Sequence, residues 1–152
     1  MKFEEYRQLD GLALAKAVAE KQVTPAELLE VAIARANAVD PVLNAMVTPL
    51  YEEARKVAAQ PLSGPLAGVP MLVKDYFQEM AGVPHYMGNL GLKNRQHRAE
   101  QDAELIKRWR QAGLVIFGRT STPEFAIKGV TEPEATGITR NQIGRASCRE
   151  RV

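Results

Sequence analysis

Residues 66–75 read Leu66-Ala-Gly-Val-Pro-Met-Leu-Val-Lys-Asp75, and the architecture of the chain follows from this segment. Gly68 and Pro70 mark a turn, and the apolar run at 71–73 follows it directly. Such a run predicts a short strand that is buried on both faces, in a sheet covered by helices. Lys74 stands at the end of that strand.

Lys74 has two interpretations at this position. An ammonium carried into a protein interior is costly unless it is paired or gives up its proton. A lysine that is neutral near pH 7 is a general base, so a buried Lys74 would be catalytic. Alternatively, the strand has already reached solvent, and Lys74 simply ends it beside Asp75. These ten residues leave both interpretations open.

The segment after Lys74 predicts an α/β unit. Residues 76–100 lack a sustained hydrophobic period, and residues 102–112 form an amphipathic pattern that Gly113 ends. A second strand of the buried type is expected at 114–117, where Leu-Val-Ile-Phe precedes Gly118-Arg119. The order strand, loop, helix, strand is typical of an α/β unit with a right-handed crossover. A long irregular segment after a core strand is commonly a binding or active-site loop.

The chain before this unit predicts a helical layer without chemistry. We expect helices over residues 10–20, 24–38 and 48–59, and a short strand or extended connector at 43–47. The second helix has the clearest start, because Thr24-Pro-Ala-Glu27 is a capping box with proline at the first helical position. Asp40-Pro41 should end that helix.

Length and composition indicate an ordinary globular chain. At 152 residues, 45% apolar and 25% charged, it could form one domain or part of a larger one. No run approaches the length of a membrane span, and the acidic N-terminus is unlike a signal peptide. We therefore expect a cytoplasmic protein. A single cysteine, Cys148, cannot form an internal disulfide, which agrees with a reducing compartment.

The net charge of +2 comes entirely from the C-terminal end. Residues 143–152 carry three arginines and one glutamate, and without them 17 basic and 17 acidic residues remain. Residues 1–142 therefore have no net charge, and nothing indicates a nucleic-acid or membrane partner. His85 and His97 lie in the irregular segment without a carboxylate or cysteine at metal-ligand spacing, so we treat both as solvated and expect no metal site.

Several motifs, occurring in the right order, resemble the amidase-signature hydrolases. They are GPLAGVPMLVKD, DAELIKRWRQAGLVIFGRTSTPEFA and TGITRN, and the earlier TPAELLEVAIARANAVDPVLNAMVT resembles the leading helices of that family. The resemblance covers roughly residues 8–142. The sequence around Lys74 and TSTPEF is most similar to those of bacterial amidases that act on linear or cyclic 6-aminohexanoate oligomers.

The resemblance implies a fold and a mechanism. The fold is the amidase-signature α/β/α sandwich around a mixed sheet, of which this chain would hold the N-terminal portion. The mechanism uses a triad of serine, cis-serine and lysine, and Lys74 falls on the family's lysine in the motif GVPxxVKD. The neutral amine takes a proton from the bridging serine, which deprotonates the nucleophilic serine. The nucleophile attacks the amide carbonyl, oxyanion-hole amides stabilise the tetrahedral intermediate, and water hydrolyses the acyl-enzyme.

The sequence departs from the family where both triad serines should follow. The family continues with TRNP and a Gly/Ser-rich segment, whereas this chain reads Thr139-Arg-Asn-Gln142 and then IGRASCRERV. Its only serines, at 63, 121 and 147, match no triad position. The last ten residues resemble the peptide encoded when a reading frame runs into a common sequencing adapter.

We therefore expect residues 1–142 to be the N-terminal part of an amidase-signature domain and residues 143–152 to be a non-native tail. The alternative is a genuine basic C-terminal extension. The parent enzyme would hydrolyse a small-molecule amide without a cofactor, and this chain would be inactive because it supplies only Lys74. Two further functions stay open, the A subunit of a tRNA-dependent amidotransferase and a non-catalytic fragment. A homodimer is kept open as the assembly of the parent enzyme.

Overall fold

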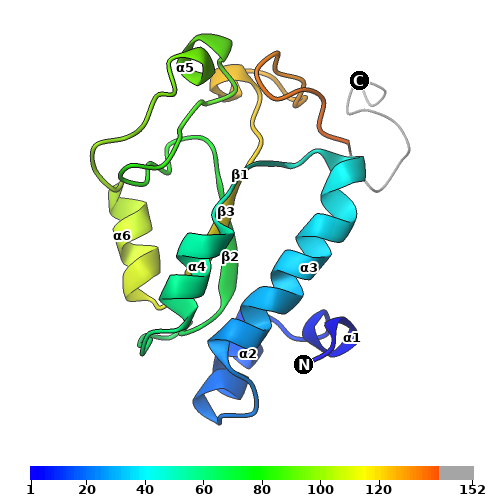
Figure 1. Ribbon diagram of the computed structural model, residues 1–152, viewed down its shortest axis with the longest axis vertical. Helices are drawn as coiled ribbons and strands as arrows, with labels where there is room; N and C mark the ends of the chain where they lie inside the picture. The colour runs from blue at the N-terminus through cyan, green and yellow to red at the C-terminus, as the bar shows by residue number, and fades with distance from the viewer. Residues whose placement is uncertain (141–152) are drawn as a thin grey trace. The chain divides into compact units, whose positions relative to one another are not determined.

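The computed structural model describes residues 1–140, and it is a mixed α/β structure (Figure 1). The expected non-native tail at 143–152 lies outside the described residues. The helices and strands follow one another in the order α1 (Phe3–Tyr6), α2 (Gly11–Ala19), α3 (Pro25–Leu43), β1 (Met46–Pro49), α4 (Tyr51–Ala58), β2 (Pro70–Lys74), α5 (Leu90–Asn94), α6 (Glu104–Gln111) and β3 (Val115–Thr120), with a 3₁₀ turn at Glu124–Ala126.

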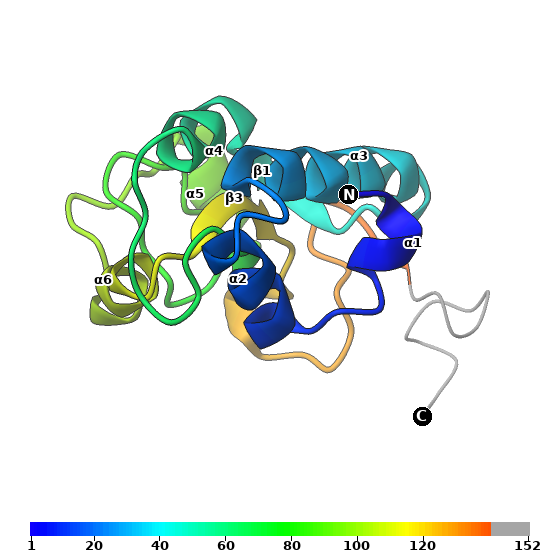
Figure 2. The same cartoon turned by 90° about the horizontal axis from the view of Figure 1, so that it is seen from below.

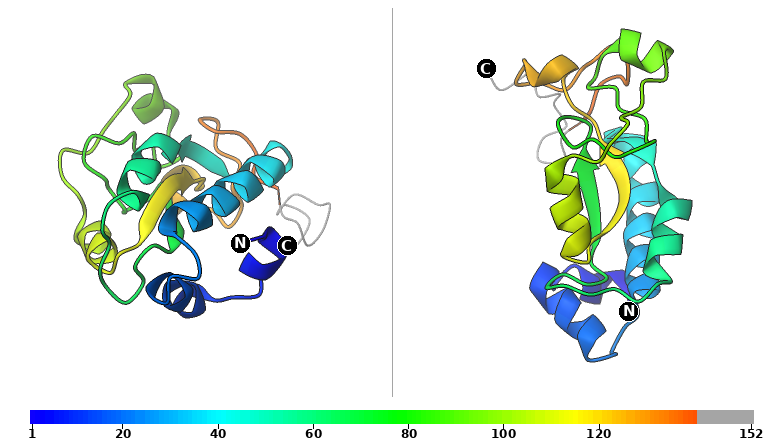
Figure 3. Two further views of the ribbon diagram at one scale, coloured as in Figure 1. Left: turned by 60° about the horizontal axis from the view of Figure 1, so that its bottom comes forward. Right: turned by 90° about the vertical axis from the view of Figure 1, so that its left-hand side faces the viewer.

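The strands within residues 1–140 form one mixed sheet in the order β1-β3-β2. β2 is parallel to β3, because the Val115 amide donates to the Val69 carbonyl and the Asp75 amide donates to the Thr120 carbonyl. The right-hand view of Figure 3 shows β2 in green beside β3 in yellow. The α/β unit expected from the sequence is confirmed, with α6 between its two parallel strands.

β1 pairs with β3 in the antiparallel direction. The Ser121 amide donates to the Ala45 carbonyl, and the Leu50 amide donates to the Phe117 carbonyl. The second bond corrects the expected helix over 48–59. Because Leu50 is still paired with β3, Pro49 belongs to the strand, and α4 begins only at Tyr51.

The two parallel strands differ in burial. β3, the central strand, is buried from Val115 to Arg119 and continues through Thr120, three residues beyond the expected end at 117. β2 lies at an edge of the described sheet, and Val73 is its one buried residue. The expectation that β2 would be buried on both faces is therefore wrong.

The N-terminal helices begin as expected, but the second ends later. The Asp10 carboxylate accepts from the Ala13 amide at 2.8 Å, and the Thr24 amide donates to the Glu27 carboxylate, also at 2.8 Å. α3 continues through Pro41 to Leu43 instead of ending near residue 38. The Asp40 carboxylate accepts from the Ala45 and Met46 amides (2.7 and 2.8 Å). The two backbone amides that follow the last turn of α3 therefore have hydrogen-bond partners.

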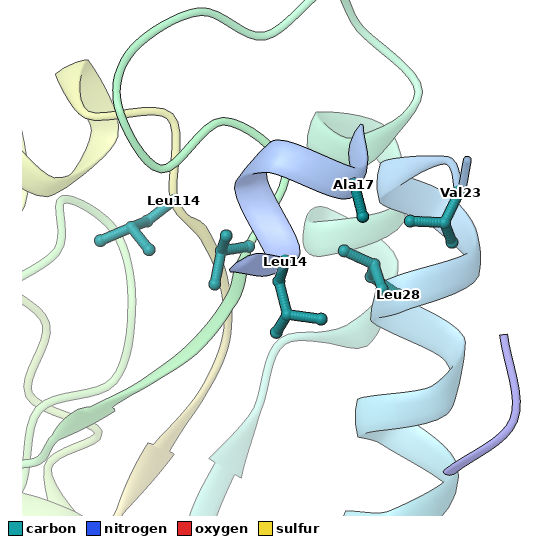
Figure 4. Packing of buried hydrophobic residues seen from close by; sticks show 6 residues of the cluster. Leu14, Ala17, Val23, Leu28 and Leu114 are labelled. Carbon is teal, nitrogen blue, oxygen red and sulfur yellow. The ribbon is translucent and has the colours of Figure 1, made fainter. Parts of the chain in front are cut away.

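The chain divides into two compact units. The first contains Met1–Ala38, Leu50–Leu72 and Lys107–Gly118, and its core is apolar. Figure 2 shows α2 beside the first turns of α3, and Figure 4 shows the side chains that meet between them and the start of β3. The buried residues of this cluster are Leu14, Ala17, Val23, Leu28, Val69 and Leu114.

The second unit contains Val39–Pro49, Val73–Ile106 and the chain from Arg119 onward. It is rich in loops and turns, which hydrogen bonds from side chains connect. The Asn89 side-chain oxygen accepts from the Leu92 amide at the start of α5 (2.9 Å), while the Asn89 side-chain nitrogen donates to Glu124 (2.6 Å). At the top of Figure 1, α5 accordingly lies beside the orange turns near Glu124. None of the helices within residues 1–140 has the length and apolar character that a membrane crossing requires.

Gly113 allows the end of α6 to contact the turn that opens the Lys74 stretch. The Leu66 and Gly68 amides donate to the Ala112 and Gly113 carbonyls, each at 2.9 Å. Gly113 has φ +87°, and a Cβ on it would lie 2.6 Å from the Ala67 Cα atom. Any other residue at this position is therefore strained and clashes with backbone.

We expect Gly113→Ala to lower the free energy of unfolding by about 2–4 kcal/mol, because it adds the cost of a positive φ to a backbone clash. Urea denaturation monitored by circular dichroism measures this loss. Gly82→Ala is the matched control, since Gly82 has φ +73° but no atom within 4 Å of the place that a Cβ would occupy. It should cost only about 1–2 kcal/mol. Equal losses for the two variants would contradict the steric part of the explanation.

Candidate functional site

A buried ion pair joins the ends of the two parallel strands within the second unit. Asp75 follows β2, and Arg119 is the last buried residue of β3. Their side chains are 1% and 0% exposed, and the Arg119 Nε lies 3.1 Å from the Asp75 Oδ1. Because the carboxyl ends of neighbouring parallel strands meet at one edge, two residues 44 positions apart come into contact.

Arg119 also binds the backbone of the turn after β2. One terminal nitrogen donates to the Gln78 carbonyl at 2.7 Å, and the other donates to the Lys74 carbonyl at 3.2 Å. With the Nε bond to Asp75, the guanidinium reaches three acceptors through its planar fork, which a lysine could not reproduce with the same geometry. Burial lowers the pKa of Arg119, and the Asp75 carboxylate opposes that decrease.

Asp75 extends this network to the irregular loop. Its carboxylate accepts from the Tyr86 amide at 3.2 Å and from the Met87 amide at 3.0 Å. Burial raises the pKa of Asp75, whereas the charge of Arg119 and the two amide bonds act against the rise. The carboxylate thus connects the end of β2, the end of β3 and residues 86–87.

The structure places Lys74 at the exposed end of β2. Its amide donates to the Gln78 side-chain oxygen at 2.6 Å, and its carbonyl accepts from Arg119. Within residues 1–140, the ammonium forms neither a hydrogen bond nor an ion pair, including with the neighbouring Asp75. The described residues therefore do not bury the amine, because Lys74 is the exposed last residue of an edge strand.

The described serines have structural roles or lie in a loop. The Ser121 hydroxyl lies 2.6 Å from the Thr139 hydroxyl, which donates its single hydrogen to the Asn44 carbonyl at 2.9 Å. Ser121 must therefore be the donor to Thr139. Ser63 is exposed in the loop before the Lys74 stretch, and Ser147 lies outside the described residues.

His85 is buried, which corrects the expectation that it is solvated. His97 is exposed, as expected, but His85 is only 1% exposed. In the described part of the chain neither ring nitrogen of His85 has a hydrogen-bond partner, and the nearest carboxylate oxygen, on Glu79, is 3.9 Å from Nδ1. Burial, followed by the positive charge of Arg119, lowers the pKa of His85 to about 4, so the imidazole is neutral at pH 7.

Sequence reasoning considers Lys74 but misses the pair beside it. A signal is present, because an acidic residue and an arginine each end a strand of one expected parallel pair. Arg119 is expected beyond its strand because a charged residue usually marks the surface. Within residues 1–140, no group of three or more histidine, cysteine, aspartate or glutamate side chains could hold a metal ion.

Comparison with known proteins gives one consistent family. Residues 27–147 match the Amidase family model. The 6-aminohexanoate-cyclic-dimer hydrolase of Paenarthrobacter ureafaciens is 42% identical over 139 residues, which are 90% of this chain and 28% of that protein. A structure of 6-aminohexanoate cyclic dimer hydrolase complexed with substrate superposes with a TM-score of 0.83 at 42% identity, covering 88% of this chain and 27% of the other.

A second relative has a different function. The A subunit of the glutamyl-tRNA(Gln) amidotransferase from Mycobacterium tuberculosis strain H37Ra is 35% identical over 141 residues, which are 87% of this chain and 28% of that protein. The chain therefore spans a little over a quarter of the length of each of these relatives. The superposition agrees with the fold class expected from the sequence, the N-terminal part of an α/β amidase structure.

We expect the buried neutral His85 to make the protein less stable in acid. Its folded-state pKa of about 4 lies below the unfolded value of about 6.5, so the unfolded chain binds the proton first as the pH falls through this window. The stabilisation is complete above pH 6.5 and is lost towards pH 4. Between pH 7 and pH 5 the loss should be about 2 kcal/mol, measured by urea denaturation at each pH.

His85→Gln should remove this part of the pH dependence, because glutamine does not titrate. His97→Gln is the matched control and should keep most of the wild-type dependence, since His97 is exposed and is the smallest of the influences on the pKa of His85. The same pH dependence in all three proteins would show that His85 is not the responsible group.

Proposed function

The chain belongs to the amidase family, and from that premise we propose that it forms part of an enzyme that hydrolyses a carboxamide bond. The observation that carries the proposal is Lys74. Its backbone is fixed by hydrogen bonds on both sides, while its amine has no partner within residues 1–140. An amine presented in this way is available to a hydroxyl group supplied by another segment.

In the proposed mechanism, Lys74 is the general base of a serine, cis-serine and lysine triad. Its neutral amine accepts the proton of the bridging serine, which takes the proton of the nucleophilic serine as the latter attacks the amide carbonyl. The proton passes to the leaving amine, and water then hydrolyses the acyl-enzyme. Ser121 donates to Thr139 and Ser63 is exposed in a loop, so we assign both serines of this mechanism to segments outside residues 1–140. By this mechanism the chain alone does not turn over an amide.

In this proposal, other parts of the enzyme shield the Lys74 amine from water. An amine works as a base near pH 7 only where water is largely excluded from its charged form. The described residues leave Lys74 exposed, so desolvation has to come from the segment that carries the serines. The expected location in the cytoplasm stays a prediction.

The substrate that we propose is a small linear or cyclic amide of 6-aminohexanoate, on the strength of the hydrolase relative. The amidotransferase relative favours a second candidate, a component that works with partner proteins. A purified whole enzyme that hydrolyses the cyclic dimer without any partner would support the first candidate. A requirement for a second polypeptide would support the other.

The role of Lys74 can be tested in a chimera in which residues 1–140 replace the matching part of the Paenarthrobacter hydrolase. We expect Lys74→Ala to lower kcat for the cyclic dimer by about 10²–10⁴-fold with little change in KM, because proton transfer occurs in the transition state. Lys74→Arg should be equally slow, since a guanidinium does not accept a proton. Lys56→Ala, on the exposed face of α4, is the control and should stay active. Substantial activity in the arginine variant would show that Lys74 contributes charge alone.

We further propose that residues 143–152 are not native. The family match extends to residue 147, and thus into this segment. The proposal rests instead on the abrupt change to a basic sequence after Gln142. Amplifying the locus from source DNA should give a reading frame that leaves IGRASCRERV and continues into a Gly/Ser-rich segment. Recovery of the same ten codons followed by a stop codon would refute this expectation.

A further inference from the structure

We propose that Arg119 is a positioning residue for Lys74, an inference that rests on the function proposed above for Lys74. Arg119 fixes the backbone from which the lysine side chain extends, and it neutralises the neighbouring Asp75 carboxylate, whose charge would otherwise favour the protonated amine. Nothing in the family match by itself requires this role, because it depends on the contacts of this one side chain.

Arg119 holds the backbone of Lys74 in place. Arg119 is 0% exposed and donates to the Lys74 carbonyl and to the Gln78 carbonyl, while the Lys74 amide donates to the Gln78 side chain. The Lys74 amide is therefore bound to Gln78 on the turn after β2, and the Lys74 carbonyl is bound to Arg119 on β3. Only the rotations within the lysine side chain remain to set where the amine lies.

The turn needs such a clamp because its own packing is weak. Phe77, at its tip, has φ +51° in the left-handed region, and its side chain is 66% exposed. A phenylalanine in this conformation is strained and buries little apolar surface in return. The hydrogen bonds from the guanidinium thus act with the Gln78 side-chain bond to hold the turn after β2 in one arrangement.

Arg119 also neutralises the charge of the Asp75 carboxylate. Asp75 is adjacent to Lys74, and a free carboxylate at this position would favour the protonated amine, which cannot act as a base. In the structure the Asp75 oxygens accept from Arg119 and from the Tyr86 and Met87 amides instead. Arg119 therefore supplies the cation for Asp75 and leaves Lys74 without an ion-pair partner within residues 1–140.

Hydrogen exchange on the 152-residue chain tests the backbone step. In Arg119→Met, which keeps the length of the apolar stem, we expect the Lys74, Tyr86 and Met87 amides to exchange about tenfold faster or more. The Val115 amide, in the apolar unit, should keep its protection. Arg98→Met is the matched control, because Arg98 also donates to a backbone carbonyl, that of Gly82, but not near Lys74. Unchanged exchange at residues 74, 86 and 87, or equal acceleration at every amide, would overturn the proposal.

Kinetics in the chimera test the link to Lys74. Arg119→Met should lower kcat by about 10- to 100-fold with little change in KM, as expected when a reacting group is misplaced by about an ångström. Arg119→Lys should recover part of the loss, because an ammonium can still pair with Asp75. In a Lys74→Ala background, Arg119→Met should have no further effect, since there is no base left to position.

The possible outcomes separate the two proposals. If Lys74→Ala has the expected low kcat and Arg119→Met lowers that residual kcat further, the positioning role is wrong and the function of Lys74 stands. If Arg119→Lys recovers nothing, or KM rises as much as kcat falls, the positioning role is wrong as well. If Lys74→Ala keeps full activity, the proposed function fails and the role of Arg119 fails with it.

Discussion

The buried pair between Asp75 and Arg119 is the interaction on which the second unit depends. A guanidinium at 0% exposure has to be surrounded by acceptors, and here these are one carboxylate and two carbonyls of a single turn. Removing one partner of such a pair generally costs about 3–5 kcal/mol, because the other charge stays buried. The directions of the bonds therefore fix how β2 ends, how the loop at 86–87 approaches and where β3 stops being buried.

The two units are stabilised in different ways. The first is held by apolar side chains such as Leu14 and Leu28, whose contacts are non-directional and tolerate exchange for residues of similar volume. The second depends on polar groups that must each meet a particular partner, as Thr139 does with Ser121 and Asn44. Polar networks specify one arrangement more strictly than apolar contacts, which suits a region that has to present a reacting group.

What the sequence could predict follows from the range of each interaction. The capping box at Thr24 and the helix stop at Gly113 act over a few residues, and both are found as expected. Pro41 does not stop its helix, and the Asp40 side chain binds the two amides that follow the helix. Leu50 stays in the sheet because of a carbonyl 67 positions away. His85 and Arg119 are buried by segments distant in the sequence, which no local pattern reveals. The exposure of Lys74 was likewise not decidable from its strand alone.

The parallel pairing of β2 and β3 also sets an order of events during synthesis. Asp75 leaves the ribosome 44 residues before Arg119, a delay of roughly 2 to 9 seconds at typical elongation rates. Throughout that interval the carboxylate lacks its cationic partner, and the Tyr86 and Met87 amides are the partners that emerge before Arg119. The end of β2 therefore stays incomplete while the apolar helices before it can already associate. The last residue of the hydrogen-bonded set around Ser121, Thr139, appears later still, 95 positions after its acceptor Asn44. The surroundings of Lys74 are thus a late, high-contact-order product of folding, and a nascent chain cannot present this lysine before β3 has emerged.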